Sequence, residues 1–447
     1  MKIVKASEVG EYAIERMLTK ASFDEVELSP KIREANKKTF GRDMTAAELV
    51  RQIVGDVRRE GDAAVIRYTS LIDRVDYKPE DFLVTEAEYE AAEKAADPAV
   101  VESLRKAAEN VRRYHQEQKP NSWMTYREKG SILGQSIIPL DRVGIYVPGG
   151  TAAYPSSVIM NAVPASVAGV GEIIMMVPPK NGKINPYVLI AARAAGVKKI
   201  YKIGGAQAIA AMAFGTETIP RVDKITGPGN IFVTLAKKEV YGHVDIDMLA
   251  GPSEILIVAD KTADPVYTAA DMLSQAEHDP LASSIVITDD EELAGKVAKE
   301  AEKQLAKLPR REIAQASIDR NGLIVVAEDM MQAMRFANVS APEHMELLTA
   351  QPFQLLPYVR HAGAVFLGAY SPEPLGDYFA GPNHVLPTGG TARYYSVLNV
   401  ETFMKRTSII SYTQPALSDV SEDIIRLAET EGLQAHANAI RIRREQK

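Results

Sequence analysis

RVGIYVPGG, residues 142–150, is a short apolar run that ends in a glycine turn. From here to about residue 367, similar apolar runs alternate with alanine-rich or amphipathic segments, including 186–195, 206–214 and 291–308. This alternation indicates a mostly parallel sheet with helices on its faces. The strands are expected at Val143–Val147, Ile173–Val177, Lys199–Ile203, Ile255–Val258, Ser284–Thr288, Leu323–Val326 and Ala364–Leu367.

Seven such strands fit two smaller sheets better than one large sheet, with a break near residues 245–255, where a Gly-Pro turn stands. We therefore predict an α/β protein with two Rossmann-like parallel-sheet domains, a helical N-terminal arm and a small C-terminal extension. A β-hairpin is expected around Lys129-Gly130, and a helix over 421–431. The expected units are residues 1–35 as the arm, 141–251 as one Rossmann-like domain, 36–140 plus 252–395 as the other α/β domain, and 396–447 as the tail.

The net charge, the apolar runs and the lack of cysteine exclude several classes of function. The chain has 447 residues and a formal charge of 52 − 59 = −7, and this mild acidity argues against a nucleic-acid partner. No apolar run approaches the roughly 20 residues that span a bilayer, and the first residues lack an apolar signal core, so we expect no membrane partner and a cytoplasmic protein. Cysteine is absent, which excludes disulfides, thiolate zinc sites and a cysteine nucleophile.

The stretch DMLSQAEHDP, residues 271–280, is typical of the last turns of a helix stopped by Pro280. Gln275 and His278 are three residues apart and would share one face of that helix. An amide oxygen beside an imidazole nitrogen could hold a divalent metal ion. The alternative is a polar helix end that faces solvent.

Histidine is rare, with seven copies at positions 115, 243, 278, 344, 361, 384 and 436. His115 is expected to be a solvated helix-end residue, and His243 and His361 to lie in turns. The other four stand near predicted loops, and because open sheets bind ligands beyond the carboxyl ends of their strands, a shared site is a competitive interpretation.

Glu343 and His344 are adjacent, and together they could serve two proton transfers at one centre. A surface helix start, with the carboxylate in the first turn, is the alternative. The long loop over 371–395 is rich in glycine, proline and aromatic residues, a composition that favours a functional loop over a disordered one.

Glycine turns follow several predicted strands, at 148–150, 204–207, 227–230 and 251–254. Each could bring backbone N–H groups close to a phosphate or a ribose. The strict G-x-G-x-x-G fingerprint is missing, however, so plain tight turns explain these segments about as well.

Taken together, these segments resemble the histidinol dehydrogenase family. The matching motifs run in family order from about residue 140 to the end, and the helical N-terminal part also fits. They are GIYVPGGT (144–151), GGAQAI (204–209), GPGN (227–230), AGPSE (250–254), LSQAEH (273–278), APEH (341–344), GDY (376–378), GPNHVLPT (381–388) and GLQAH (432–436).

The resemblance implies oxidation of L-histidinol to L-histidine through the aldehyde, with two NAD⁺ and one zinc ion per subunit. It implies Glu343 and His344 as the acid/base pair. The implied zinc ligands, which also contact substrate, are Gln275, His278, Asp377 and His436. The implied NAD contacts are Tyr146, Gln207 and Asn230. The remaining implied substrate contacts are Ser253, His384 and Glu431, besides His344. Related dehydrogenases of sulfonated alcohols share much of this scaffold.

The residue chemistry agrees with that reaction. Two oxygens and two imidazoles form a site that zinc, manganese or cobalt could occupy. Without cysteine, the aldehyde cannot form a thiohemiacetal, so water must attack it to give a gem-diol. Glu343 is the candidate base for that water, and His344 for the alcohol and gem-diol protons.

Two other function classes compete with this one. A zinc hydrolase could use Glu343 to activate a metal-bound water, although the glycine turns favour a nucleotide partner. A non-catalytic nucleotide-binding module would not need both Glu343 and His344. The segment from about Ser411 is too small to bury its own core, and the resemblance implies that it reaches across a homodimer whose sites are shared between subunits.

Overall fold

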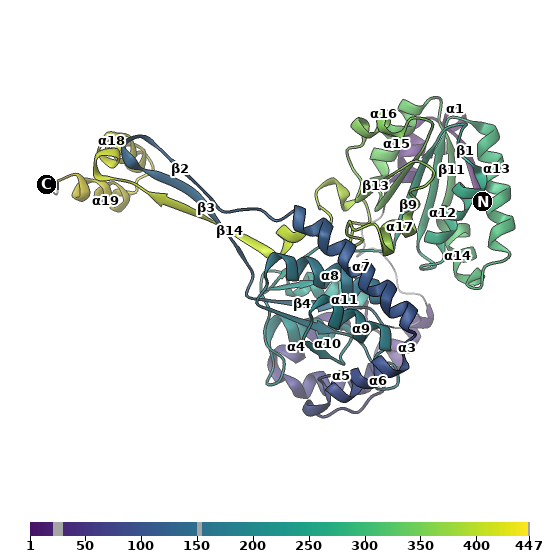
Figure 1. Ribbon diagram of the computed structural model, residues 1–447, viewed down its shortest axis with the longest axis horizontal. Coiled ribbons are helices and arrows are strands. Elements are labelled where there is room, and N and C mark those ends of the chain that lie inside the picture. The colour runs from purple at the N-terminus through teal and green to yellow at the C-terminus, as the bar shows by residue number, and fades with distance from the viewer. Residues whose placement is uncertain (21–29, 150–153, 446–447) are drawn as a thin grey trace.

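The computed structural model describes residues 1–20, 30–149 and 154–445. Within these residues the protein is mixed α/β, as predicted, with one five-stranded, one six-stranded and one three-stranded sheet (Figure 1). No helix in the described part of the chain is long and apolar enough to cross a membrane.

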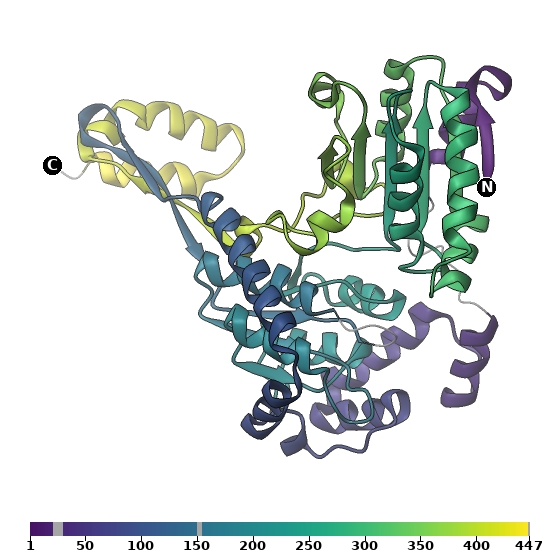
Figure 2. The same ribbon diagram turned by 45° about the vertical axis from the view of Figure 1, so that its right-hand side comes forward.

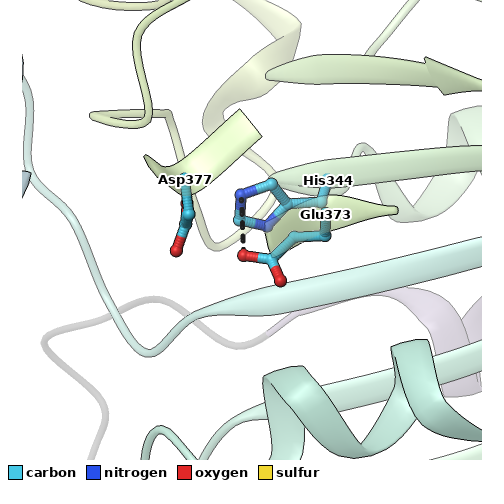
Figure 3. Close-up of side chains that lie close together, drawn as sticks. All are labelled: His344, Glu373 and Asp377. Carbon is cyan, nitrogen blue, oxygen red and sulfur yellow. Dashed lines mark ion pairs between the residues drawn. The ribbon is translucent and has the colours of Figure 1, made fainter. Parts of the chain in front are cut away.

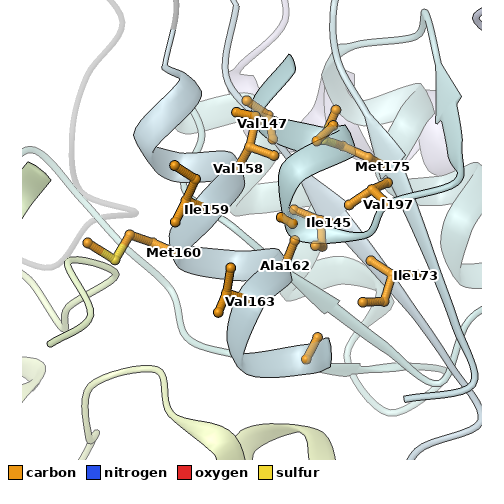
Figure 4. Packing of buried hydrophobic residues seen from close by; sticks show 14 of the residues in the cluster. Ile145, Val147, Val158, Ile159, Met160, Ala162, Val163, Ile173, Met175 and Val197 are labelled. Atoms are coloured by element: carbon orange, nitrogen blue, oxygen red, sulfur yellow. The ribbon is translucent and has the colours of Figure 1, made fainter. Parts of the chain in front are cut away.

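The five-stranded sheet is parallel, in the order β6-β5-β4-β7-β8. Its order reverses at β4, so a topological switch point lies between β4 and β7. Apolar side chains of α8 pack on β4 and β5, as Figure 4 shows for Val158 beside Val147 and Ala162 beside Ile145. The strands are β4 (Arg142–Tyr146), β5 (Glu172–Met176), β6 (Lys199–Tyr201), β7 (Lys224–Thr226) and β8 (Asp245–Ile246); the helices are α8 (Pro155–Ala168), α9 (Pro186–Ala195), α10 (Gly205–Phe214) and α11 (Ile231–Val240).

Helices from residues 36–140 cover this five-stranded sheet, whereas the expectation grouped 36–140 with 252–395. The apolar stripe Leu49, Ile53 and Val57 lies on α4, in one core with Ile209 and Met212 of α10. The pattern predicted the stripe correctly but did not specify which sheet it would cover. These helices are α3 (Pro30–Phe40), α4 (Ala46–Glu60), α5 (Asp62–Asp73), α6 (Glu86–Ala95) and α7 (Pro98–Glu117).

The six-stranded sheet is parallel, in the order β1-β11-β10-β9-β12-β13. Its edge strand β1 (Lys2–Lys5) comes from the segment expected as an arm, and Lys2 pairs with Leu323. A four-residue edge strand with lysine at both ends gives almost no apolar signal, so sequence reasoning missed it. The other strands are β9 (Glu254–Ala259), β10 (Ser283–Thr288), β11 (Gly322–Val326), β12 (His344–Leu348) and β13 (Ala364–Leu367). The helices are α1 (Ala6–Val9), α2 (Glu11–Leu18), α12 (Pro265–Ala276), α13 (Glu291–Leu305), α14 (Arg311–Asn321), α15 (Met330–Ser340), α16 (Pro352–Leu355) and α17 (Glu373–Tyr378).

The third sheet is antiparallel and contains the predicted hairpin, β2 (Trp123–Tyr126) with β3 (Ile132–Pro139), joined by β14 (Met404–Ser411). This sheet forms an extension that carries α18 (Gln414–Thr430) and α19 (Gln434–Glu445) at its tip (Figure 1). The extension is called the arm from here on and is distinct from the N-terminal arm expected over residues 1–35. The helix expected over 421–431 begins at Gln414 instead, because the Thr413 side chain accepts the N–H of Ala416 and caps it. Short 3₁₀ turns occupy Pro79–Asp81, Glu128–Gly130, Leu356–Tyr358, Thr391–Arg393 and Val400–Phe403.

The two parallel-sheet domains meet at the ends of their strands, and the arm leads away from both (Figure 2). At the carboxyl edge of the five-stranded sheet, the first half of α8 contacts the loop after α17. There Asn383 Nδ2 donates to the Met160 carbonyl at 2.6 Å, and Ser157 Oγ lies 3.5 Å from His384 Nε2. This junction brings the carboxyl ends of one sheet towards the amino ends of the other.

Candidate active site

Glu343 and His344 lie at the amino end of β12, an inner strand of the six-stranded sheet next to the edge strand β13. His344 is the first residue of the strand and pairs with Ile255 of β9 and Ala364 of β13. Glu343 is only 6% exposed and His344 3%, so the surface helix start considered from the sequence is wrong. The expectation of a site beyond carboxyl ends also fails for this sheet, since these residues precede or begin their strand.

The His344 ring is held in one tautomer. Its Nδ1–H donates to the carbonyl oxygen of Glu254 at 2.9 Å, which leaves Nε2 with a lone pair. Nε2 faces Glu373, with 4.0 Å to its Oε1 (Figure 3). Burial lowers the pKa of His344 to about 4, so the ring is neutral near pH 7 and can accept a proton.

Glu343 is anchored beside this ring. Its Oε2 accepts the backbone N–H of Glu254 at 2.8 Å and lies 3.6 Å from His344 Nδ1. Burial raises the pKa of the Glu343 carboxyl well above its ordinary value of 4.5, and the neighbouring carboxylates add to that rise. Two proton acceptors with pKa values shifted in opposite directions therefore stand side by side, an arrangement suited to acid/base chemistry.

Gln275 and His278 approach the same place from the end of α12. The helix stops at Ala276, and His278 follows the capping Glu277, yet Gln275 Nε2 and His278 Nδ1 remain 3.4 Å apart. The two side chains therefore lie together as predicted, but His278 stands past the end of the helix and not on its face. Gln275 is fully buried, and its Oε1 has no hydrogen-bond partner among the residues described. An orphaned buried oxygen beside an imidazole suits a metal ion.

Asp377 comes from α17, a short helix inside the stretch expected to be a loop. His384 Nδ1 lies 3.5 Å from Asp377 Oδ1. Burial alone would raise the pKa of Asp377, but the hydrogen bond and charge of His384, together with His344 and Glu373, outweigh burial and lower that pKa. Asp377 also influences the pKa of His278, which burial lowers. Gln275, His278 and Asp377 are thus gathered around one region, consistent with three of the four implied ligands.

Glu373 is the site residue that sequence reasoning missed. Its Oε2 accepts from Ser274 Oγ at 3.2 Å, and burial raises its pKa to about 9. Ligand atoms of His344, Glu373 and Asp377 all lie within 4.8 Å of one another (Figure 3). The signal was available, because Glu373 and Asp377 are four apart and share a helical face, but a loop assignment concealed it.

His436 and Glu431 lie elsewhere. His436 lies on α19 and Glu431 lies just before it, and both are exposed at the tip of the arm (Figure 1). Within one chain the structure therefore does not bring these two residues to the other site residues.

The residues implied to contact NAD line the carboxyl edge of the five-stranded sheet. Tyr146 ends β4 and accepts the Gly205 N–H on its hydroxyl at 3.1 Å, and Asn230 caps α11 by accepting from Phe232 and Val233. Tyr146 and Asn230 therefore flank the switch point between β4 and β7, where open sheets bind ligands. Gln207 lies in the first turn of α10.

The structure also shows the surroundings of Gly227, Ser253 and His115. Gly227 is required by packing, since a Cβ there would lie 2.0 Å from the Tyr146 carbonyl oxygen. Ser253 directly precedes β9 and is the neighbour of Glu254, whose backbone bonds both Glu343 and His344. His115 is not solvated as expected: it is buried inside α7, with Nδ1 bonded to the Val111 carbonyl at 2.7 Å and Nε2 facing Asn383. Gly150 and Thr151 of the first glycine motif fall outside the described residues.

Comparison with known proteins decides the family. The histidinol dehydrogenase family model matches residues 36–444. The chain belongs to the histidinol dehydrogenase family. It is 55% identical over 408 residues to the histidinol dehydrogenase of Heliobacterium mobile, covering 91% of this chain and 95% of that one. Identity is 56% over 395 residues to the Bacillus subtilis (strain 168) enzyme, covering 88% and 92%.

A solved histidinol dehydrogenase structure from Elizabethkingia anophelis superposes on this chain with a TM-score of 0.90 at 35% identity, covering 99% of this chain and 98% of that one. The fold of this family member is therefore that of a histidinol dehydrogenase, and the chain is an oxidoreductase.

Proposed function

We propose that this protein oxidises L-histidinol to L-histidine through L-histidinal, with two NAD⁺ and one zinc ion per subunit, as the last steps of histidine biosynthesis. The observation that carries the proposal is the pair of buried proton acceptors in a member of the histidinol dehydrogenase family. His344 Nε2 is neutral and unprotonated, and Glu343 stands within 3.6 Å of the same ring.

In the first oxidation, His344 Nε2 takes the proton of the alcohol hydroxyl as the carbon loses hydride to NAD⁺. The Glu254 carbonyl holds the opposite nitrogen of the ring and stabilises the imidazolium that forms. A ring fixed in this way keeps its basic nitrogen aimed at the substrate without reorganisation.

In the second oxidation, Glu343 removes a proton from water as the water oxygen attacks the aldehyde carbon. The His344 imidazolium returns its proton to the carbonyl oxygen, which gives the gem-diol and restores the neutral ring. His344 then takes a proton from the gem-diol as the second hydride passes to the second NAD⁺. The chain contains no cysteine that could form a thiohemiacetal instead. The raised pKa of Glu343 makes its carboxylate a stronger base, which supports this role.

The metal ligands proposed are Gln275, His278, Asp377 and His436. Zinc, when bound, would polarise the substrate oxygen and orient the imidazole and amine of histidinol. The orphaned Oε1 of Gln275 and the low pKa of Asp377 fit a cation between them. Ser253, His384 and Glu431 are the proposed further substrate contacts, and Tyr146, Gln207 and Asn230 the NAD contacts.

The site is proposed to be shared between two subunits of a homodimer. His436 and Glu431 are exposed at the end of an arm, whereas the other ligands are gathered in the body of the chain. If the arm of each subunit reaches its partner, each body receives the fourth ligand, and a two-fold axis makes both sites complete.

Absorbance at 340 nm tests the reaction. With NAD⁺ and L-histidinol, the protein should form two NADH for each histidinol consumed, and a sulfonated alcohol should give a far lower rate. One NADH per histidinol would remove the second oxidation from the proposal. Preference for the sulfonated alcohol would reassign the substrate, and absence of NADH with both would contradict the proposed dehydrogenase activity.

A further inference from the structure

Asp73 is a partly buried carboxylate that the mechanism above does not use. It is the last residue of α5, which packs against α10. Its Oδ2 accepts a hydrogen bond from Gln207 Nε2 at 3.4 Å. The other end of that amide, Oε1, is buried and has no hydrogen-bond partner within the described ranges.

No cation in the described part of the chain neutralises the charge of Asp73. Among the residues that the structure describes, no ion pair involves Asp73, and burial raises its pKa to about 6 without an opposing positive group. Lys180 and Lys183 lie in the turn after β5, which Tyr77 holds through a 3.2 Å hydrogen bond to Gly182, but neither pairs with Asp73. A desolvated carboxylate beside an unsatisfied amide oxygen is costly unless a ligand donates hydrogen bonds to both.

The position of Asp73 suggests what that ligand is. In doubly wound sheets that bind dinucleotides, an acidic residue close to the end of the second strand accepts the hydroxyls of the adenosine ribose. Here the second strand, β5, ends at Met176 and is followed by Val177-Pro178-Pro179, which offers no carboxylate. Asp73 reaches the same edge of the sheet from α5, which lies outside the β-α-β unit. Burial is the main cause of the raised pKa of Tyr146, and the charge of Asp73 is close enough to add to that rise.

We propose that Asp73 accepts the 2′- and 3′-hydroxyls of the adenosine ribose of NAD⁺, and that its charge excludes the 2′-phosphate of NADP⁺. The inference rests on the proposed function, in which NAD⁺ is the co-substrate. The nicotinamide has to reach His344 in the other domain, so the group beside α5 is the opposite, adenosine end. The free Oε1 of Gln207 accepts a further ribose hydroxyl.

The test is Asp73→Asn, in which an amide oxygen can still accept from Gln207 while the charge is lost. Dissociation constants are measured by calorimetry for ADP-ribose and for its 2′-phosphate, which report the adenosine half without turnover. Wild type should bind ADP-ribose at least tenfold more tightly than the 2′-phosphate. The variant should lose about tenfold in ADP-ribose affinity, as expected for hydrogen bonds to a charged group, and its preference for ADP-ribose should shrink.

Asp76→Asn is the matched control, because Asp76 lies three residues away, is exposed and bonds only Ser70 among the contacts described. Both affinities should remain at wild-type values in this control. An unchanged ADP-ribose affinity and preference in Asp73→Asn would overturn the inference, as would wild-type protein that does not bind ADP-ribose. If histidinol still drives NADH formation in either case, the proposed function stands and only the role of Asp73 falls.

Discussion

The amino edge of the six-stranded sheet and the tip of the arm contain the two halves of the proposed site, and they differ in burial. Glu343 and His344 are 6% and 3% exposed and are bonded to β9, whereas Glu431 and His436 are exposed. Groups whose pKa values must be shifted need a fixed, desolvated setting. Groups that only ligate can stand on a surface until docking buries them. The difference fits the proposal that one chain provides the acid/base chemistry and another completes the ligand set.

The arm itself supports this division. Large apolar side chains of the arm are exposed, with Tyr126 at 79% and Ile410 at 73% on its sheet and Leu427 at 67% on α18. Exposed apolar side chains of this size are suited to a protein interface. An arm with exposed apolar side chains and two proposed site residues at its tip fits a homodimer with exchanged arms.

The largest effect is expected from the buried half. His344→Asn should slow both oxidations by about 10³-fold, within the usual range for a lost general base, because Nε2 serves both proton transfers. Stopped-flow assays with histidinol and with histidinal measure the two steps separately. His243→Asn, at an exposed turn between α11 and β8 in the other domain, serves as the control and should retain full activity. A variant that keeps one step at the wild-type rate would contradict the shared base.

Glu343→Gln should separate the steps. Aldehyde oxidation needs an activated water and should fall by about 10²-fold, whereas alcohol oxidation should fall much less. The amide oxygen can still accept the Glu254 N–H, so the fold should be preserved. Equal losses in kcat for histidinol and histidinal would refute the division of roles between Glu343 and His344.

Zinc binding should need ligands from both halves of the proposed site, the body of one chain and the tip of the arm. Chelation should abolish turnover and added zinc should restore it. His278→Ala and His436→Ala should each lower the zinc content, measured by atomic absorption after dialysis, without changing the circular dichroism. Glu277→Gln, next to one ligand, should retain one zinc ion per subunit. Full zinc content in His436→Ala would show that the tip contributes no ligand.

The smallest effect concerns Glu346, buried behind the site. It accepts the Glu373 N–H at 2.8 Å and bonds the Asp271 carboxyl, and burial raises its pKa well above 4.5. The folded state therefore holds this proton more tightly than the unfolded chain, so its contribution to stability is complete below about pH 4.5 and is lost as pH rises towards the folded pKa.

Glu346→Gln should remove that dependence. Between pH 5.5 and 8, the free energy of unfolding of wild type should fall relative to the variant by at most about 1.4 kcal/mol per pH unit, the limit for one proton. Urea unfolding of metal-free protein at a fixed protein concentration measures it. Parallel pH profiles for the two proteins would contradict the raised pKa.

Much of the fold was predictable because buried parallel strands are continuous apolar runs, and all seven predicted strands are present. β12 was missed because His344 and Glu346 place polar groups at buried strand positions, where function overrides the apolar pattern. β7 and β8 are only three and two residues long, too short for any periodic signal.

Part of the site was predictable as well. The spacing of Gln275 and His278 placed both side chains together, as their 3.4 Å contact confirms. The position at the amino edge of the sheet was not predictable, because local patterns do not encode how two domains face each other. For the same reason, the grouping of residues 36–140 with the wrong sheet could not have been avoided.

Complementation between two inactive variants tests the shared site most directly. His344→Ala and His436→Ala are unfolded together in equal amounts, refolded, and assayed at 340 nm. If the arm acts on the partner, a mixed dimer has one site with both lesions and one with neither. Random pairing makes about half of the dimers mixed, so roughly a quarter of wild-type activity should return. If mixed dimers are shown to be present and the mixture stays inactive, the arm serves its own chain and the shared site is refuted.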